Sequence, residues 1–127
     1  MLALQALYEI DSVGREPEAV IERSITSGGI VGENAGFVRE LVTGTVKNRE
    51  AIDEHIKTLA PAWPLDQIAM VDRTILRLAI FEILYDNKVP VKAAVNEAVE
   101  LAKQFGSESS AKFINGVLGA VSAKAGR

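Results

Sequence analysis

Few side chains in this sequence are of the types that carry out catalysis. The 127 residues include one histidine, His55, and no cysteine, which excludes disulfides, thiolate metal sites and cysteine nucleophiles. A general acid or base must be positioned in a cleft, but His55 lies between Glu54 and Ile56 in a helical pattern that favours a solvated or half-buried structural histidine. A single histidine also argues against zinc, and no Asp-x-Asp-x-Asp-Gly calcium loop occurs. We therefore predict no catalytic residue, no metal site and no cofactor.

Two other patterns resemble reactive or phosphate-binding sites but have simpler interpretations. Asn96, Glu97 and Glu100 share one predicted helix, where a polar face with a local salt bridge to Lys103 or Lys92 is the favoured interpretation. The glycine-rich run at 28–32 is not followed by the Lys-Ser/Thr pair of a phosphate loop. Nucleotide binding is therefore not expected there.

Arg77 is a charge within an otherwise apolar helix. Such a group must find a partner or reach the surface. We expect an internal pair with a neighbouring acid or with a carbonyl that the guanidinium caps.

The segment Ser109–Gly116 has the composition of a nucleic-acid contact. It begins a predicted helix, and a helix N-terminus attracts phosphate. Lys112 adds positive charge, Phe113 can stack on an unpaired base, and Asn115 can read a base edge. The alternative for Phe113 is a place in the hydrophobic core.

The elements that must position these residues are predicted to be helices throughout, since no strand pattern of useful length appears. From Val71 to Tyr85 apolar side chains lie on nearly every side of a helix, which indicates burial among other helices. With 48% hydrophobic and 24% charged residues, the chain is expected to form one soluble all-α domain of about seven helices. These helices are predicted over 2–12, from 17 onward, over 34–60, 65–69, 71–86, 91–105 and 109–123.

Several of these helices have predicted ends. Asn34 is a candidate N-cap of the long helix over 34–60, and Pro61 should end it. Asp66 and Asp72 are candidate caps of the short and the central helix. Gly106 is expected to end the 91–105 helix in the left-handed conformation.

The other glycines have predicted packing roles. Gly44, in the middle of the long helix, should let another backbone come close, because glycine otherwise destabilises a helix interior by roughly 1 kcal/mol. Gly116 and Gly119 would likewise allow close contact between the last helix and a neighbour.

Charge predicts only weak phosphate affinity. The net charge is −3, with six Lys/Arg against ten Asp/Glu in residues 1–60 and eight against seven in 61–127. From Lys103 onward there are four basic residues and one acid, Glu108, which is far from a strongly basic domain. The central segment is too short and too charged to span a bilayer, and the first residues lack the basic leader of a secretory signal. We therefore expect a cytoplasmic protein without membrane contact.

Four blocks of sequence resemble the NusB family of bacterial transcription antitermination factors, over roughly residues 2–121. Each block would be weak alone, but their order and spacing are specific. They are Ala3-Leu4-Gln5-Ala6-Leu7-Tyr8, Val71-Asp72-Arg73-Thr74-Ile75-Leu76-Arg77-Leu78-Ala79, Val95-Asn96-Glu97-Ala98-Val99-Glu100-Leu101-Ala102-Lys103-Gln104-Phe105-Gly106 and Lys112-Phe113-Ile114-Asn115-Gly116-Val117-Leu118.

The resemblance implies an all-α fold of two packed halves, about 1–60 and 61–123, without catalytic activity. It implies binding of the boxA element of ribosomal-RNA leader transcripts together with NusE, a small-subunit ribosomal protein. The complex would join elongating RNA polymerase and suppress premature termination. The family's RNA contacts carry over to Lys112, Phe113 and Asn115, and its protein-partner surface carries over to Tyr8, Asp72 and Glu82.

The sequence departs from the family in its first residues. NusB proteins usually begin with an arginine-rich segment that contacts phosphates, whereas this sequence has no basic residue before Arg15. We expect this form to fold but to bind RNA weakly, with a flatter salt dependence. Equal boxA affinities and salt slopes for this chain and one with a restored basic leader would contradict that expectation.

Two alternatives remain open. One is a NusB-like RNA-binding domain of an RNA cytosine methyltransferase, although no glycine-rich methyl-donor fingerprint follows the last helix. The other is a structural dimer module, because NusB relatives differ in whether they form homodimers.

Overall fold

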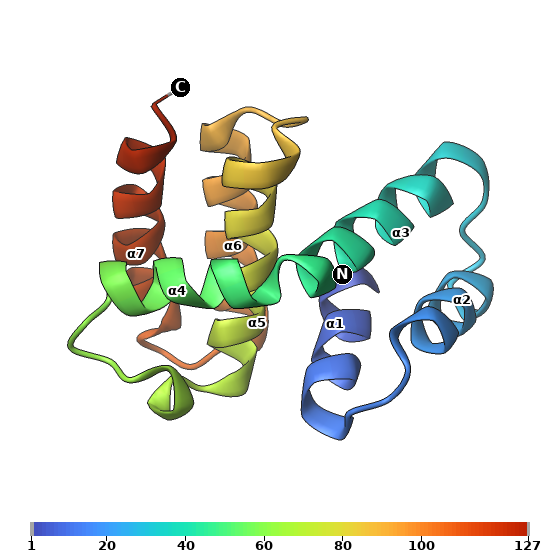
Figure 1. Cartoon of the computed structure of the whole chain (residues 1–127). Coiled ribbons are helices and arrows are strands. Elements are labelled where there is room, and N and C mark those ends of the chain that lie inside the picture. Colours follow the sequence, from blue (N-terminus) through green and yellow to red (C-terminus); the bar gives the residue numbers. More distant parts are fainter. Residues whose placement is uncertain (1, 127) are drawn as a thin grey trace.

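The computed structural model describes residues 2–126, and over these residues every regular element is helical (Figure 1). This confirms the predicted all-α class. The α-helices are α1 (Leu2–Val13), α2 (Pro17–Ser27), α3 (Gly32–Lys47), α4 (Arg49–Leu59), α5 (Met70–Ile80), α6 (Val91–Phe105) and α7 (Ser110–Ala125). A 3-10 turn, η1 (Leu65–Gln67), precedes α5, and a π-helix, η2 (Phe81–Asp86), continues it.

The helix α5 lies at the centre of the bundle. It packs against α1, α3, α4, α6 and α7, and Ile75, Leu76 and Ile80 on different sides of it are at most 1% exposed. In Figure 1, α1, α2 and α3 form one group of helices and α4 to α7 form the other. Since α4 packs against α5 and α7, the predicted first half extends into the second group, and a boundary at residue 60 stays a prediction. No helix in the described part of the chain has the length and hydrophobicity of a membrane span.

The predicted long helix over 34–60 is in fact two helices that meet at Asn48. The Asn48 backbone leaves the helical region (φ −103°, ψ 12°), and its side-chain amide donates a hydrogen bond of 2.8 Å to the Gly44 carbonyl. The Asn48 backbone N–H donates to the same Gly44 carbonyl at 3.1 Å, so both groups of Asn48 bond to the last turn of α3, and Asn48 is the C-cap of that helix. The predicted cap at Asn34 is also wrong. The helix α3 already begins at Gly32, with Val31 as the N-cap.

The glycines pack differently from the prediction. Gly44 faces the Phe81 ring rather than another backbone, and a Cβ there would lie 2.1 Å from Phe81 Cζ. Gly116 and Gly119 are exposed, and a Cβ at either would meet no atom within 4 Å. These two residues therefore do not mediate a helix contact within this chain.

The turn before α7 depends on contact between Gly106 and Ser110. Gly106 is extended (φ −91°, ψ −171°) rather than left-handed, and a Cβ would lie 2.5 Å from Ser110 Oγ. Ser110 is buried, and its hydroxyl accepts a hydrogen bond of 2.8 Å from the Ser107 N–H. The glycine is thus needed for close approach, and this contact fixes where α7 begins.

Neither predicted aspartate cap forms. Pro64 and Ala69 occupy the N-cap positions of η1 and α5, without a side-chain cap hydrogen bond. Asp66 lies in the first turn of η1 and Asp72 in the first turn of α5. Asp72 still lies near the positive end of the α5 helix dipole.

Candidate nucleic-acid and partner interfaces

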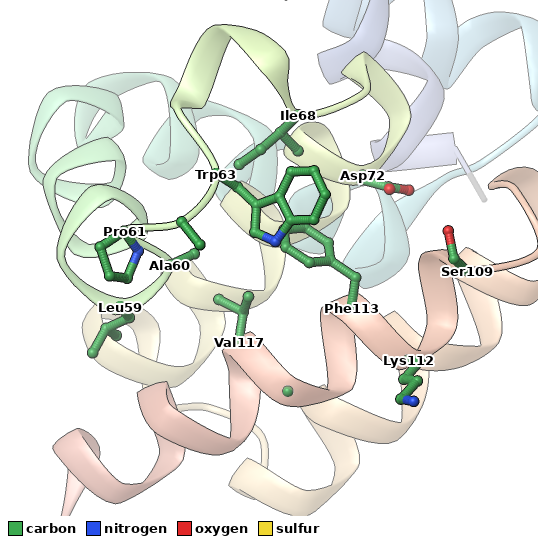
Figure 2. A pocket seen from close by; sticks show the side chains of 12 residues that line it. Leu59, Ala60, Pro61, Trp63, Ile68, Asp72, Ser109, Lys112, Phe113 and Val117 are labelled. Carbon is green, nitrogen blue, oxygen red and sulfur yellow. The ribbon is translucent and has the colours of Figure 1, made fainter.

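A groove of about 610 Å³ runs between the segment that follows α4 and the first turns of α7. This volume falls within the range of small-molecule binding sites. Figure 2 shows that Trp63 and Phe113 lie at its centre, with Leu59 and Pro61 on one side and Asp72 and Ser109 on the other. Ile68, Lys112 and Val117 complete its walls.

Trp63 reaches the groove because two prolines keep its segment out of a helix. Pro61 ends α4, and Pro64 precedes η1. Between them the Trp63 N–H donates to the Ala60 carbonyl in a turn, at 3.1 Å. The indole is 53% exposed and meets the Phe113 ring edge to face, with centroids 6.0 Å apart and planes at 74°. The result is an open aromatic pair of the kind on which bases stack.

The predicted RNA residues do not all share this groove. Phe113 is partly buried against the core and also lines the groove, so the two alternatives for this residue coexist. Lys112 lines it too, is exposed, and has no acidic partner among residues 2–126. Asn115 is exposed on α7 but does not line the groove.

Asp72, predicted on the protein-partner surface, lines the same groove as Lys112 and Phe113. It is 7% exposed, and its Oδ1 accepts no hydrogen bond within the described residues. A buried carboxylate oxygen without a donor is costly. Within the described residues this carboxylate oxygen is therefore left without the hydrogen bond that would offset its burial.

Tyr8 lies in a second groove, of about 450 Å³, that the structure forms between α1, α5 and α6. Tyr8 is 39% exposed, and Val71 and Phe105 form the facing walls. Most of the lining is apolar, with Glu9 at its edge. This groove has the character of a protein-docking surface.

Glu82 lies in a crevice between α5, η2 and α6, together with Ile75 and Leu78. Burial raises the pKa of the Glu82 carboxyl to about 7, and the nearby Asp86 and Glu97 charges add to this rise. The neutral acid can donate a hydrogen bond that an ionised glutamate cannot.

Helix geometry explains why Asp72 is separated from the other two predicted partner residues. Val71, Ile75, Leu78 and Glu82 follow one another at helical spacing, so the Tyr8 groove and the Glu82 crevice lie along one side of α5. Asp72 is one position further than Val71, which turns its side chain by about 100° into the other groove.

Arg77 and His55 have structural contacts. Arg77 pairs with Asp53 and Asp11, which confirms the predicted internal ion pair.

The His55 ring lies between the Tyr85 hydroxyl (2.9 Å) and Lys124 Nζ (2.8 Å), and burial and the Lys124 charge lower the pKa of His55. The helix α6 carries the predicted local salt bridge between Glu100 and Lys103, at 3.3 Å. Among residues 2–126, no three His, Asp or Glu side chains are placed to hold a metal ion.

Trp63 is the residue of this interface that the sequence interpretation did not single out. The available signal was a lone tryptophan in a short segment with a proline on either side. The two prolines keep this segment out of a helix, so Trp63 cannot be buried on the apolar face of a helix as the other large side chains are.

Comparison with known proteins assigns the chain to a family. The NusB family model matches residues 1–123. The transcription antitermination protein NusB of Dehalococcoides mccartyi is 52% identical over 121 residues, which cover 95% of this chain and 85% of the relative. The corresponding protein of Chloroflexus aggregans is 48% identical, over 94% of this chain and 81% of the relative.

Solved structures agree with this assignment. T. maritima NusB has a TM-score of 0.90 at 28% identity, covering 97% of this chain and 87% of that one. A structure of the antitermination factors NusB and NusE in complex with double-stranded RNA matches with a TM-score of 0.88 at 26% identity, over 97% of this chain and 92% of that one. The sequence and the fold thus agree, and the chain belongs to the NusB family.

Proposed function

We propose that this chain is a transcription antitermination factor that binds RNA together with NusE. Its relatives are named as transcription antitermination proteins, and a related NusB was solved with NusE and double-stranded RNA. Within this proposal the RNA is the boxA element of ribosomal-RNA leader transcripts. The bound complex joins RNA polymerase and suppresses premature termination.

The observation that carries the RNA-binding part is the open groove with Trp63 and Phe113 at its centre and Lys112 at its wall. The exposed Trp63 indole and the partly buried Phe113 ring supply aromatic surface on which unpaired bases can stack. Lys112, on the first turn of α7, supplies charge where the helix dipole also favours phosphate. Stacking and phosphate contact are thus available within one site, with Asn115 one turn further along α7.

The NusE contact is best supported on the side of α5 that carries the Tyr8 groove and the Glu82 crevice. This surface combines an apolar groove with Glu82 and Glu97 in the adjoining crevice, whereas Glu9 at the edge of the groove is already paired with Arg15 and Arg23. Such a surface suits a partner with an apolar anchor and basic side chains. We therefore retain Tyr8 and Glu82 as partner residues and place Asp72 with the RNA groove.

The test is a titration of fluorescent boxA RNA with this chain, with NusE, and with both together. Joint binding should be tighter than binding to either protein alone. Phe113→Ala should weaken RNA binding while the NusE complex persists, and Tyr8→Ala should weaken the NusE complex. RNA affinity that is the same with and without this chain would contradict the proposed function.

The sequence left two alternatives open, a methyltransferase domain and a homodimer, and the comparisons bear only on the first. The curated relatives are named as antitermination proteins, so they give no support to a methyltransferase domain. A homodimer stays a proposal, with the apolar Tyr8 groove as the candidate contact. Light scattering over a range of concentrations, with and without NusE, would detect a dimer that NusE displaces.

A further inference from the structure

Asp72 is the least satisfied polar group that lines the Trp63–Phe113 groove. Its side chain is more than nine-tenths buried, yet Oδ1 accepts no hydrogen bond from residues 2–126. The adjacent Arg73 does not relieve it, because consecutive helix residues point in different directions. The Arg73 guanidinium instead donates to the Leu65 carbonyl, at 3.2 Å, and contacts Met70 Sδ, at 3.4 Å.

The carboxylate lies beside the Trp63–Phe113 aromatic pair, on which a flat ring can stack. In Figure 2, Asp72 and Ser109 lie at one side of the Trp63–Phe113 pair. A planar ring stacked on either aromatic face would therefore turn one edge toward Asp72. That edge must carry donors, because an ionised carboxylate only accepts hydrogen bonds.

Of the four bases, guanine matches this requirement best. Its Watson–Crick edge offers two adjacent donors, N1–H and the N2 amine, to the two oxygens of one carboxylate. Adenine and cytosine each offer one amine next to an acceptor nitrogen, and uracil offers one N–H between two carbonyl oxygens. With any of these three, an acceptor would face the second carboxylate oxygen.

We propose that Asp72 is a specificity-determining residue that selects an unpaired guanine in the groove between Trp63 and Phe113. This inference rests on the proposed RNA-binding function and adds the class of base that the groove accepts. Lys112 on the groove wall offsets the repulsion between the Asp72 charge and the RNA backbone. A protein side chain donating to Asp72 is the competing occupant. The aromatic pair and the unpaired lysine favour RNA.

The experiment compares fluorescent heptamers in which a central nucleotide within a uridine run is guanosine, inosine, adenosine, cytidine or uridine. They are titrated against the full chain, alone and with NusE. The guanosine heptamer should bind about tenfold more tightly than the uridine heptamer, as expected for one bidentate base contact. Inosine, which lacks the N2 amine, should lose most of this preference, and this comparison requires no variant.

Asp72→Asn is the matched protein change, because the amide keeps the shape and replaces one acceptor by a donor. The preference for guanosine should disappear in this variant, with its helicity and melting temperature retained. Asp66→Asn, on the exposed face of η1 outside the groove, is the control and should leave the preference unchanged.

The outcomes separate this inference from the proposed function. Heptamers that bind with equal affinity, or a preference that survives Asp72→Asn, would overturn the role of Asp72 and leave RNA binding intact. Weaker NusE binding by Asp72→Asn with an unchanged base preference would assign Asp72 to the protein partner instead. No binding of any heptamer or of boxA RNA, with or without NusE, would overturn both.

Discussion

Arg77 of α5 holds Asp53 of α4 by two parallel hydrogen bonds, Nε to Oδ1 at 2.8 Å and Nη2 to Oδ2 at 3.0 Å. The remaining guanidinium nitrogen, Nη1, donates to Asp11 of α1 at 2.8 Å. Asp11 also accepts from Arg49 at 2.6 Å, and its side chain is 1% exposed. One arginine thus ties α1, α4 and α5 together where the two groups of helices meet.

Replacing Arg77 by methionine should therefore destabilise the fold strongly. The change leaves the buried Asp11 with only the partly exposed Arg49, and leaves Asp53 without a cationic partner among residues 2–126. Breaking a buried pair costs about 3–5 kcal/mol. Chemical denaturation should show this loss, while Arg39→Met, which removes an exposed pair with Glu22, should change stability much less because solvent screens that pair. Equal losses in the two variants would show that burial of the pair is not what matters.

Gly44→Ala should destabilise the protein although alanine is the better helix former. The new Cβ would lie 2.1 Å from Phe81 Cζ, and Phe81 is 6% exposed. Overpacking of this kind costs roughly 1–3 kcal/mol. Gly36→Ala lies in the same helix with nothing within 4 Å, so it should instead stabilise by roughly 0.5–1 kcal/mol. Adding Phe81→Leu to Gly44→Ala should recover part of the lost stability. A double variant no more stable than Gly44→Ala alone would rule out the Phe81 ring as the cause.

Phe113→Ala should weaken RNA binding by about 5- to 100-fold, the range for loss of one base–aromatic stack. Phe105→Ala is the control, because Phe105 is exposed in the Tyr8 groove and away from Trp63. Trp63 is the single tryptophan of the chain, so its fluorescence should change when RNA enters the groove. Unchanged fluorescence at saturating RNA would mean that RNA binds elsewhere.

Lys112→Ala should reduce the salt dependence of RNA binding. Each phosphate contact with a single strand contributes about 0.7 to the slope of log K against log salt, and the variant should lose about that much. Lys92→Ala, an exposed lysine at the start of α6, is the control and should keep the slope. Identical slopes in all three proteins would remove Lys112 from the phosphate contacts.

The free energy of unfolding should fall between about pH 4.5 and pH 7 because of Glu82. Its pKa is about 7 in the folded chain against an ordinary value of 4.5, so the folded state binds more protons in this window. The contribution of Glu82 to the free energy of unfolding is therefore fully present below pH 4.5 and is lost as the pH rises to 7. Above pH 7 this contribution no longer changes with pH. The change is roughly 1–2 kcal/mol after allowance for solvent screening.

Glu82→Gln should remove this part of the pH dependence and raise stability at pH 8, as measured by denaturation at several pH values. Glu108→Gln, at an exposed position, should leave the profile unchanged. A Glu82→Gln profile as steep as that of the unmodified chain would show that other groups produce the slope.

The sequence by itself determined the helices and the family, because both depend on local patterns. The spacing of apolar residues predicted the central helix at 71–86, which the structure contains as α5 and η2. A charge among apolar neighbours predicted that Arg77 would be paired, and the structure shows its pairs with Asp53 and Asp11. Helix spacing and a charge among apolar neighbours are both visible within one segment, so the linear order is enough to detect them. The partners of Arg77 lie 24 and 66 residues away and were not identified from the sequence.

Tertiary structure decided the break at Asn48 and the content of the groove. The buried positions 45, 52 and 56 fit one continuous helical period, so periodicity could not reveal the bend between α3 and α4. The groove joins Trp63, Asp72 and Phe113 from three separate segments, and a one-residue step along α5 separates Asp72 from the Tyr8 groove. Which side chains share a pocket depends on how the helices pack against one another, and that information is not contained in any one segment of the sequence.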